Sequence, residues 1–194
     1  MLYNPETQPA KVFIPYPDSV WMRALYKAPL WLWRLGFGPL LGHIFVVITT
    51  RGRKSGLPRR VVTEYVPYAG KLYTINAFGE RSQWYRNLQA DPRVTIQTWQ
   101  GAERVVATRV TDIDELLAVF AAFRRRNPVT VDAYFHDLGI GGDPASIREH
   151  HERVYLLRFD PATEAPPLPL DADLAWLWAA LLALVLILRP RRRK

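Results

Sequence analysis

The feature that most constrains the fold is a series of six short segments rich in β-branched and apolar residues. Turn-forming residues follow several of them, including Ala69-Gly70-Lys71 and Gln100-Gly101. Short strands joined mostly by hairpin-like links predict antiparallel pairing, so we expect a small antiparallel barrel. The six predicted strands are residues 43–50, 60–68, 72–78, 93–99, 104–111 and 154–159.

Helical patterns interrupt the strands and place the chain in the α+β class, mainly β with helices. Ser19 fits the N-cap of a first helix, which is rich in aromatic residues and contains Pro29, a residue that kinks helices. Asp112 or Asp114 fits the N-cap of a helix that ends in three arginines. The predicted helices are residues 19–35, 82–90 and 112–126, with a weaker one at 131–138.

The net charge of +8 is concentrated in two clusters. Five of the 26 Lys and Arg residues lie within residues 189–194, and without them 21 basic residues face 18 acidic ones. Five more lie within residues 51–60, where there is no acidic residue. This distribution argues against a nucleic-acid partner, whose binding needs a broad basic face. The chain has no cysteine, which excludes disulfides, thiolate metal ligands and a cysteine nucleophile.

The C-terminal region contains fifteen consecutive apolar residues, 174–188, ahead of the basic residues. As a helix they would reach roughly 22 Å, short of the roughly 30 Å hydrocarbon core of a bilayer. Either a core or dimer helix or a membrane contact fits this composition, and we favour membrane lipid because the segment is apolar all round. No secretory signal opens the sequence, so we expect the cytoplasmic face of a membrane.

The most informative motif is the basic turn, residues 49–60, between the first two predicted strands. Gly52 and Gly56 permit backbone geometries that other residues avoid, and Pro58 fixes the exit. Several cations and the Ser55 hydroxyl on such a turn make a cradle for phosphate or carboxylate groups. The alternative is a solvated hairpin tip whose charges protect a sheet edge. The cations of the turn are Arg51, Arg53, Lys54, Arg59 and Arg60.

A second motif lies on the predicted helix 82–90, where Trp84, Asn87 and Leu88 are spaced i, i+3 and i+4 and share one face. A tryptophan plane beside an amide suits a flat heterocycle with hydrogen-bonding edges. The alternative is a helix that packs its Trp and Leu into the core while Asn87 bonds a nearby carbonyl.

Together, T-T-R-G-R-K-S-G-L-P-R at 49–59 and W-Y-R-N-L-Q-A-D-P at 84–92 resemble the deazaflavin (F-420)-dependent nitroreductase and quinone reductase family. The match covers residues 43–112, with looser similarity up to 160. The resemblance implies a split β-barrel related to FMN-binding barrels. It also implies hydride transfer from reduced coenzyme F-420 to a small-molecule acceptor, which is a quinone, a nitro compound or another activated acceptor. The apolar C-terminal segment and the aromatic first helix favour a membrane quinone. Alternatives are an FMN-dependent barrel oxidoreductase and a barrel that binds coenzyme or lipid without turnover.

By the same resemblance, the turn holds the phosphate and acidic tail of the coenzyme, and Asn76, Ala77, Trp84 and Asn87 lie near its ring. Tyr134 matches a region of substrate-side tyrosines and is a candidate acceptor-pocket residue or proton donor, or a packing residue. The sequence departs from the family in a short loop between Gly79 and Trp84. The cofactor-binding residues of the turn are Arg53, Lys54, Ser55, Gly56, Pro58 and Arg59.

Four regions follow from these patterns, and we expect no metal site. Residues 1–42 form an irregular segment and an aromatic helix, and residues 43–160 form the cofactor-binding barrel. Residues 161–173 form a linker rich in Pro and Ala, and residues 174–194 form the membrane-seeking helix with its basic end. The chain also permits a homodimer.

Overall fold

The computed structural model describes residues 19–163 and 166–188 and shows a closed, six-stranded antiparallel β-barrel. Around the barrel the strands follow the order β1-β2-β3-β6-β5-β4, and every neighbouring pair is antiparallel. This confirms the predicted fold class. The strands are β1 Phe45–Arg51, β2 Pro58–Tyr68, β3 Lys71–Ile75, β4 Arg93–Thr98, β5 Gly101–Arg109 and β6 Leu156–Pro161.

Two tight turns fix the register of the barrel. Between β2 and β3, Tyr68 pairs with Lys71, and the two residues between them, Ala69 and Gly70, both have positive φ. That backbone is typical of a two-residue hairpin turn, whose twist matches that of the strands. Between β4 and β5, Trp99 and Gln100 form the corresponding turn. Both hairpins lie where the sequence predicts them.

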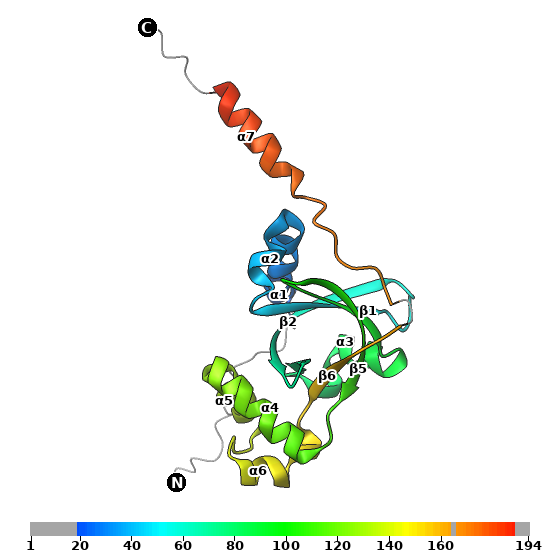
Figure 1. Ribbon diagram of the computed structural model, residues 1–194, viewed down its shortest axis with the longest axis vertical. Coiled ribbons are helices and arrows are strands. Elements are labelled where there is room, and N and C mark those ends of the chain that lie inside the picture. The colour runs from blue at the N-terminus through cyan, green and yellow to red at the C-terminus, as the bar shows by residue number, and fades with distance from the viewer. Residues whose placement is uncertain (1–18, 164–165, 189–194) are drawn as a thin grey trace, which may run out of the picture.

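Helices lie both above and below the barrel in this view, and the C-terminal helix extends beyond it (Figure 1). Asp112 caps α4 by accepting a hydrogen bond from the Glu115 N–H, and Ser19 caps α1 through the Met22 N–H, as predicted. The longer helices are α1 Val20–Leu32, α3 Gln83–Ala90, α4 Ile113–Arg126, α5 Pro128–Leu138 and α7 Trp176–Leu188. The short ones are η2 Trp33–Phe37, α2 Gly38–Leu41, η3 Gly79–Arg81, α6 Pro144–Glu149 and η4 His151–Arg153.

Two hydrophobic clusters hold this arrangement together. The first fills the barrel and includes Val46, Ile48 and Ile96, with Leu88 and Tyr85 of α3 closing it. The second lies between the outer face of the barrel and α4, α5 and α6. Burial of about 25 cal/mol per Å² of apolar surface makes these clusters the main source of stability. The main side chains of the second cluster are Tyr73, Leu116, Phe120, Phe123, Tyr134, Phe135 and Leu156.

The structure differs from the sequence-based expectations at three places. The predicted strand 72–78 ends at Ile75 because the Asn76 side chain bonds the following turn. Helix α6 was not predicted, since six residues show no periodicity, although Asp143 caps it and Pro144 begins it. In the first helix the regular helix ends at Leu32, and the break comes at Gly36, with φ of 93°, rather than at Pro29.

The predicted linker after β6 is held against the barrel. The Gln97 side chain donates to the Leu170 carbonyl at 2.9 Å and accepts the Leu170 N–H at 2.6 Å. Arg60 donates to the Pro169 carbonyl at 3.1 Å, and the Thr95 hydroxyl bonds the Pro167 carbonyl. The described part of residues 161–173 therefore forms a strap over β1, β2 and β4 rather than a free linker.

Helix α7 confirms a C-terminal apolar helix, beginning two residues later than the first apolar residue of the run. It extends away from the barrel, with its base beside α2 (Figure 1). Of the helices in the described residues, none is long and apolar enough to cross a membrane. The predicted irregular segment at 1–18 and the basic residues 189–194 lie outside the described residues.

Candidate functional site

The basic turn between β1 and β2 is a compact loop built around two glycines. The Gly52 N–H donates to the Leu57 carbonyl at 2.9 Å, and the Gly56 N–H donates to the Gly52 carbonyl at 2.7 Å. A Cβ at Gly52 would lie 2.9 Å from Ser55 Oγ, and Gly56 has a φ of 68°. The turn therefore needs glycine at both positions, and Pro58 begins β2 directly after it.

The cations of this turn fall into two groups. Arg51 forms an ion pair with Asp91 at 3.3 Å, and Arg93 bonds the same carboxylate. The hydrogen bond from Arg93 and the charge of Arg51 lower the pKa of Asp91. Lys54 and Arg59 are exposed and, within the described residues, contact no carboxylate. These two cations are free to bind an anion.

Asn87 of α3 fastens the turn to the barrel. Its Oδ1 accepts the Arg53 guanidinium at 3.0 Å and the Arg53 N–H at 3.3 Å. Its Nδ2 donates to the Thr50 hydroxyl at 3.1 Å, and the side chain is only 4% exposed. Gln83 Oε1 accepts a second Arg53 bond at 2.9 Å. Asn87 thus positions Arg53. The family resemblance instead implies that Asn87 lies near the ring of the coenzyme.

Trp84 and Asn76 lie on the two sides of the short loop before α3. Trp84 is half-buried and packs against the barrel cluster. The Asn76 side chain accepts the Ser82 hydroxyl at 2.6 Å and donates to the Gly79 carbonyl at 2.8 Å. Ala77, which follows it, packs against the outer cluster. Asn76 therefore holds the loop in shape, while Trp84 keeps part of its surface available.

Tyr134 is part of the hydrophobic core. It is 1% exposed, and its hydroxyl accepts the Tyr155 N–H at 2.8 Å. Its ring stacks on Phe120 with centroids 6.0 Å apart. Burial raises the pKa of this phenol well above its usual value, so it stays protonated at neutral pH. These contacts favour the packing interpretation over an acceptor-pocket role.

Sequence reasoning missed two residues of this network, Thr50 and Gln83. Thr50 reads as one more β-branched strand residue, and Gln83 as the exposed start of a helix. The available signal was the spacing of Asn87 four residues after Gln83, which puts two amides on one side of α3. Nothing local in the sequence indicates that Arg53 reaches that side.

His150 and His151, for which no metal role is expected, bond the Ser146 and Arg148 carbonyls.

The closed six-stranded antiparallel barrel with its flanking helices is of the FMN-binding split-barrel kind. A sequence profile of the family described as F420H(2)-dependent quinone reductase matches residues 37–137, more than half of the 194-residue chain. The chain belongs to this family. It is an oxidoreductase whose hydride donor is reduced coenzyme F-420 and whose acceptor, by family, is a quinone.

Several solved structures are similar to this chain. An F420-H2 dependent reductase (FDR-A) is 19% identical, with 60% of this chain and 93% of that chain covered and a TM-score of 0.46. HutZ, a heme storage protein from Vibrio cholerae, is 15% identical, with 75% and 97% covered and a TM-score of 0.43. A putative 5-nitroimidazole antibiotic resistance protein from Bacteroides thetaiotaomicron is 12% identical, with 61% and 74% covered and a TM-score of 0.43.

The residues of the turn fit the coenzyme of this family. Its tail carries a phosphodiester and carboxylates, as the family resemblance implies, and the turn offers Lys54, Arg59 and the Ser55 hydroxyl. Within the described residues, the bonds to the Ser55 hydroxyl are long, 3.4 Å from the Leu57 N–H and 3.5 Å from Arg59. A donor set of unpaired cations with a loosely held hydroxyl suits an anionic ligand.

Proposed function

We propose that the turn holds the anionic tail of coenzyme F-420 through Arg53, Lys54, Ser55 and Arg59, with Gly56 and Pro58 shaping the loop. The observation that supports this most is the pair of exposed cations, Lys54 and Arg59, which have no carboxylate partner in the described chain. Arg53 is held by Asn87 and so sets the direction of the turn relative to α3.

The ring of the coenzyme would lie between Trp84 and the loop that begins at Asn76 and Ala77. When bound, the reduced coenzyme supplies a hydride, and the protein's part is to bind, orient and exclude water. Trp84 offers a half-buried apolar wall, and Asn76 holds the loop between Gly79 and Ser82 in shape. Tyr134 stabilises the layer behind this region through Tyr155.

We further propose that the quinone is a membrane quinone and that residues 174–194 contact lipid at the cytoplasmic face. Helix α7 is exposed along its whole length and carries no polar side chain. A helix of this kind is stable in an apolar environment and unfavourable in water. Contact with lipid would bring the barrel close to lipophilic acceptors.

A fluorescence titration of the full chain with coenzyme F-420 tests the tail assignment. Lys54→Ala should weaken binding by about 1–3 kcal/mol, the scale of a hydrogen bond to a charged group. Arg125→Ala is the matched control, because Arg125 is exposed at the end of α4, away from the turn. Equal affinities for Lys54→Ala and Arg125→Ala would mean that the turn is merely solvated.

Turnover is the second measurement. Wild-type protein with reduced coenzyme and the quinone menadione should oxidise the coenzyme, which its absorbance reports. Tight coenzyme binding without reduction of any quinone would contradict the catalytic part of the proposal and favour a coenzyme-binding protein.

A further inference from the structure

Helix α1 carries an exposed apolar stripe that the barrel does not cover. Trp21, Leu25 and Leu32 are 87%, 69% and 41% exposed. Their spacing of i, i+4 and i+11 places them on one face of the helix. Met22, Ala28 and Leu30 are half-buried, α1 contacts β2, and the buried Trp33 follows at the end of the helix. An apolar stripe of this kind marks an interaction surface.

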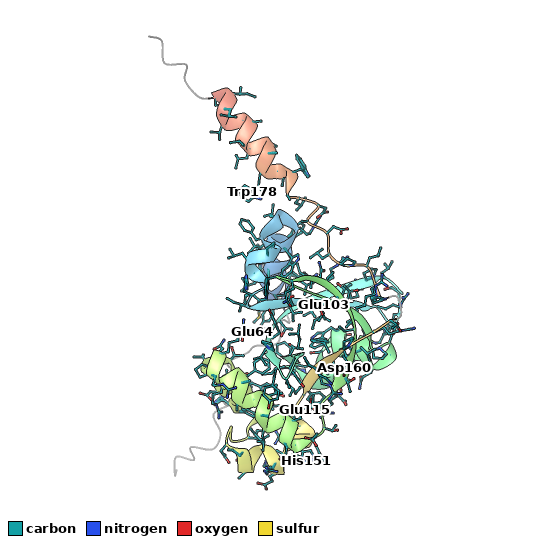
Figure 2. All side chains as sticks on the ribbon, in the orientation of Figure 1. Glu64, Glu103, Glu115, His151, Asp160 and Trp178 are labelled. Atoms are coloured by element: carbon teal, nitrogen blue, oxygen red, sulfur yellow. The ribbon has the colours of Figure 1, made fainter. Side chains whose placement is uncertain are left out.

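The base of α7 is fastened to the turn that follows α1. Arg34 binds the Asp173 carboxylate with two bonds of 2.7 and 2.6 Å, and the Leu174 N–H donates to the Arg34 carbonyl at 3.0 Å. Trp178 Nε1 donates to the Leu35 carbonyl at 2.8 Å, and its ring meets Phe37 edge to face. Figure 2 shows Trp178 at this junction. The base of α7 is thus held against η2, the segment that directly follows α1.

The basic charge near this surface comes from two segments of the sequence, α1 with η2 and the residues after α7. From Ser19 to Ile44 the sequence contains three Lys or Arg residues, Arg23, Lys27 and Arg34, and no acidic residue. Five more basic residues follow α7 within residues 189–194. An apolar surface with this surrounding charge complements a bilayer that contains anionic phospholipid.

We propose that the stripe of α1 and the whole of α7 form one surface that inserts shallowly into an anionic phospholipid bilayer. This inference rests on the proposed lipid contact of residues 174–194 and adds α1 and the Arg34–Asp173 junction to it. Pairing with a second copy would cover one side of α7 only, whereas every side of α7 is exposed. Lipid, in contrast, can cover every side of a helix that is inserted into the bilayer.

The residues at the two ends of α7 limit how deeply the helix inserts into the bilayer. Its 13 residues span about 20 Å, less than the roughly 30 Å hydrocarbon core. Trp176 and Trp178 lie at one end, and the basic residues follow the other. Tryptophan and basic side chains both favour the headgroup region. With both ends held there, α7 would lie just below one interface.

Co-sedimentation of the full chain with vesicles tests this surface. The vesicles contain phosphatidylcholine with or without phosphatidylglycerol, and wild type should bind more strongly when phosphatidylglycerol is present. Leu25→Glu in α1 and Leu182→Glu in α7 should each weaken binding about tenfold or more, because each removes a large apolar contact and adds a negative charge. Val129→Glu is the matched control, since Val129 is equally apolar and 75% exposed, on α5. It should bind as wild type.

Two results would overturn the inference. One is Leu25→Glu binding to vesicles as strongly as wild type, which would remove α1 from the surface. The other is a dimer in light scattering that Leu25→Glu dissociates, with no vesicle binding by wild type, which would assign the surface to a second copy. The coenzyme titration on the same preparations separates this outcome from failure of the coenzyme site, because that titration needs no lipid.

Discussion

Helices α3 and α7 both follow a loop, yet they contact the rest of the protein in opposite ways. Helix α3 buries Tyr85 and Leu88 in the barrel cluster and uses Asn87 to hold the basic turn. Helix α7 buries no side chain and contacts the domain only near its base. The sequence of α3 is mixed, and that of α7 is entirely apolar.

The two helices differ in the kind of group that has no partner within the protein, and this kind of group indicates which ligand each region would bind. Around α3 the side chains of Ser82, Gln83 and Asn87 are hydrogen-bonded within the protein. On the turn, the exposed cations Lys54 and Arg59 have no carboxylate partner among the described residues. Around α7 the groups left over are apolar. Unpaired cations attract an anion, and uncovered apolar surface favours lipid or another apolar partner. The same barrel therefore presents two surfaces of different chemistry.

The largest expected effect contrasts one leucine from each helix. Leu88→Ala should lower the free energy of unfolding by about 2–5 kcal/mol, because Leu88 is buried in the barrel cluster and its loss leaves a cavity. Leu182→Ala on α7 should change it by less than about 0.5 kcal/mol in the absence of lipid. Urea denaturation followed by circular dichroism measures both. Equal effects would show that α7 is buried in solution.

The next effect concerns the connection from α3 to the turn. Asn87→Ala removes the acceptor of Arg53 and the donor to Thr50, so the turn loses its fixed position. Coenzyme binding should weaken by about 1–3 kcal/mol. Gln83→Ala is the control, since it removes one exposed bond to Arg53 and leaves Asn87 in place. If both variants bind the coenzyme as wild type does, Arg53 needs no positioning by α3.

Much of the fold could be predicted because its signals are local. The alternation of β-branched residues, the two hairpin turns and the caps Ser19 and Asp112 each lie within a few residues of the element that they define. The family could be predicted from two motifs that are likewise local.

The features of the fold and of the candidate site that could not be predicted depend on contacts between residues far apart in sequence. Gln97 and Leu170, which fix the strap, are 73 positions apart, and Arg53 and Asn87 are 34 apart. Nothing near Leu170 indicates that its backbone bonds a strand. The spacing on α3 correctly placed Asn87 on the face of Leu88, but not the guanidinium that Asn87 binds. Tyr134 reads equally as a surface or a core residue until α5 is placed on the barrel.

A smaller effect is expected behind α3, where Tyr155 packs edge to face on Tyr85 with ring centroids 5.3 Å apart. Tyr134→Phe leaves the Tyr155 N–H without its acceptor and should lower the free energy of unfolding by about 1 kcal/mol. We expect kcat with menadione to stay near that of wild type. A large loss of kcat with unchanged stability would instead make Tyr134 the proton donor.

The smallest effect is expected at the base of α7. Trp178→Phe removes the bond to the Leu35 carbonyl and keeps an aromatic ring against Phe37. Because that bond is exposed, the free energy of unfolding should change by less than about 0.5 kcal/mol. Urea denaturation measures this change alongside that of Leu88→Ala. A loss as large as that of Leu88→Ala would mean that the base of α7 is integral to the barrel domain. A negligible loss fits a helix whose side chains are stabilised outside the protein, in lipid.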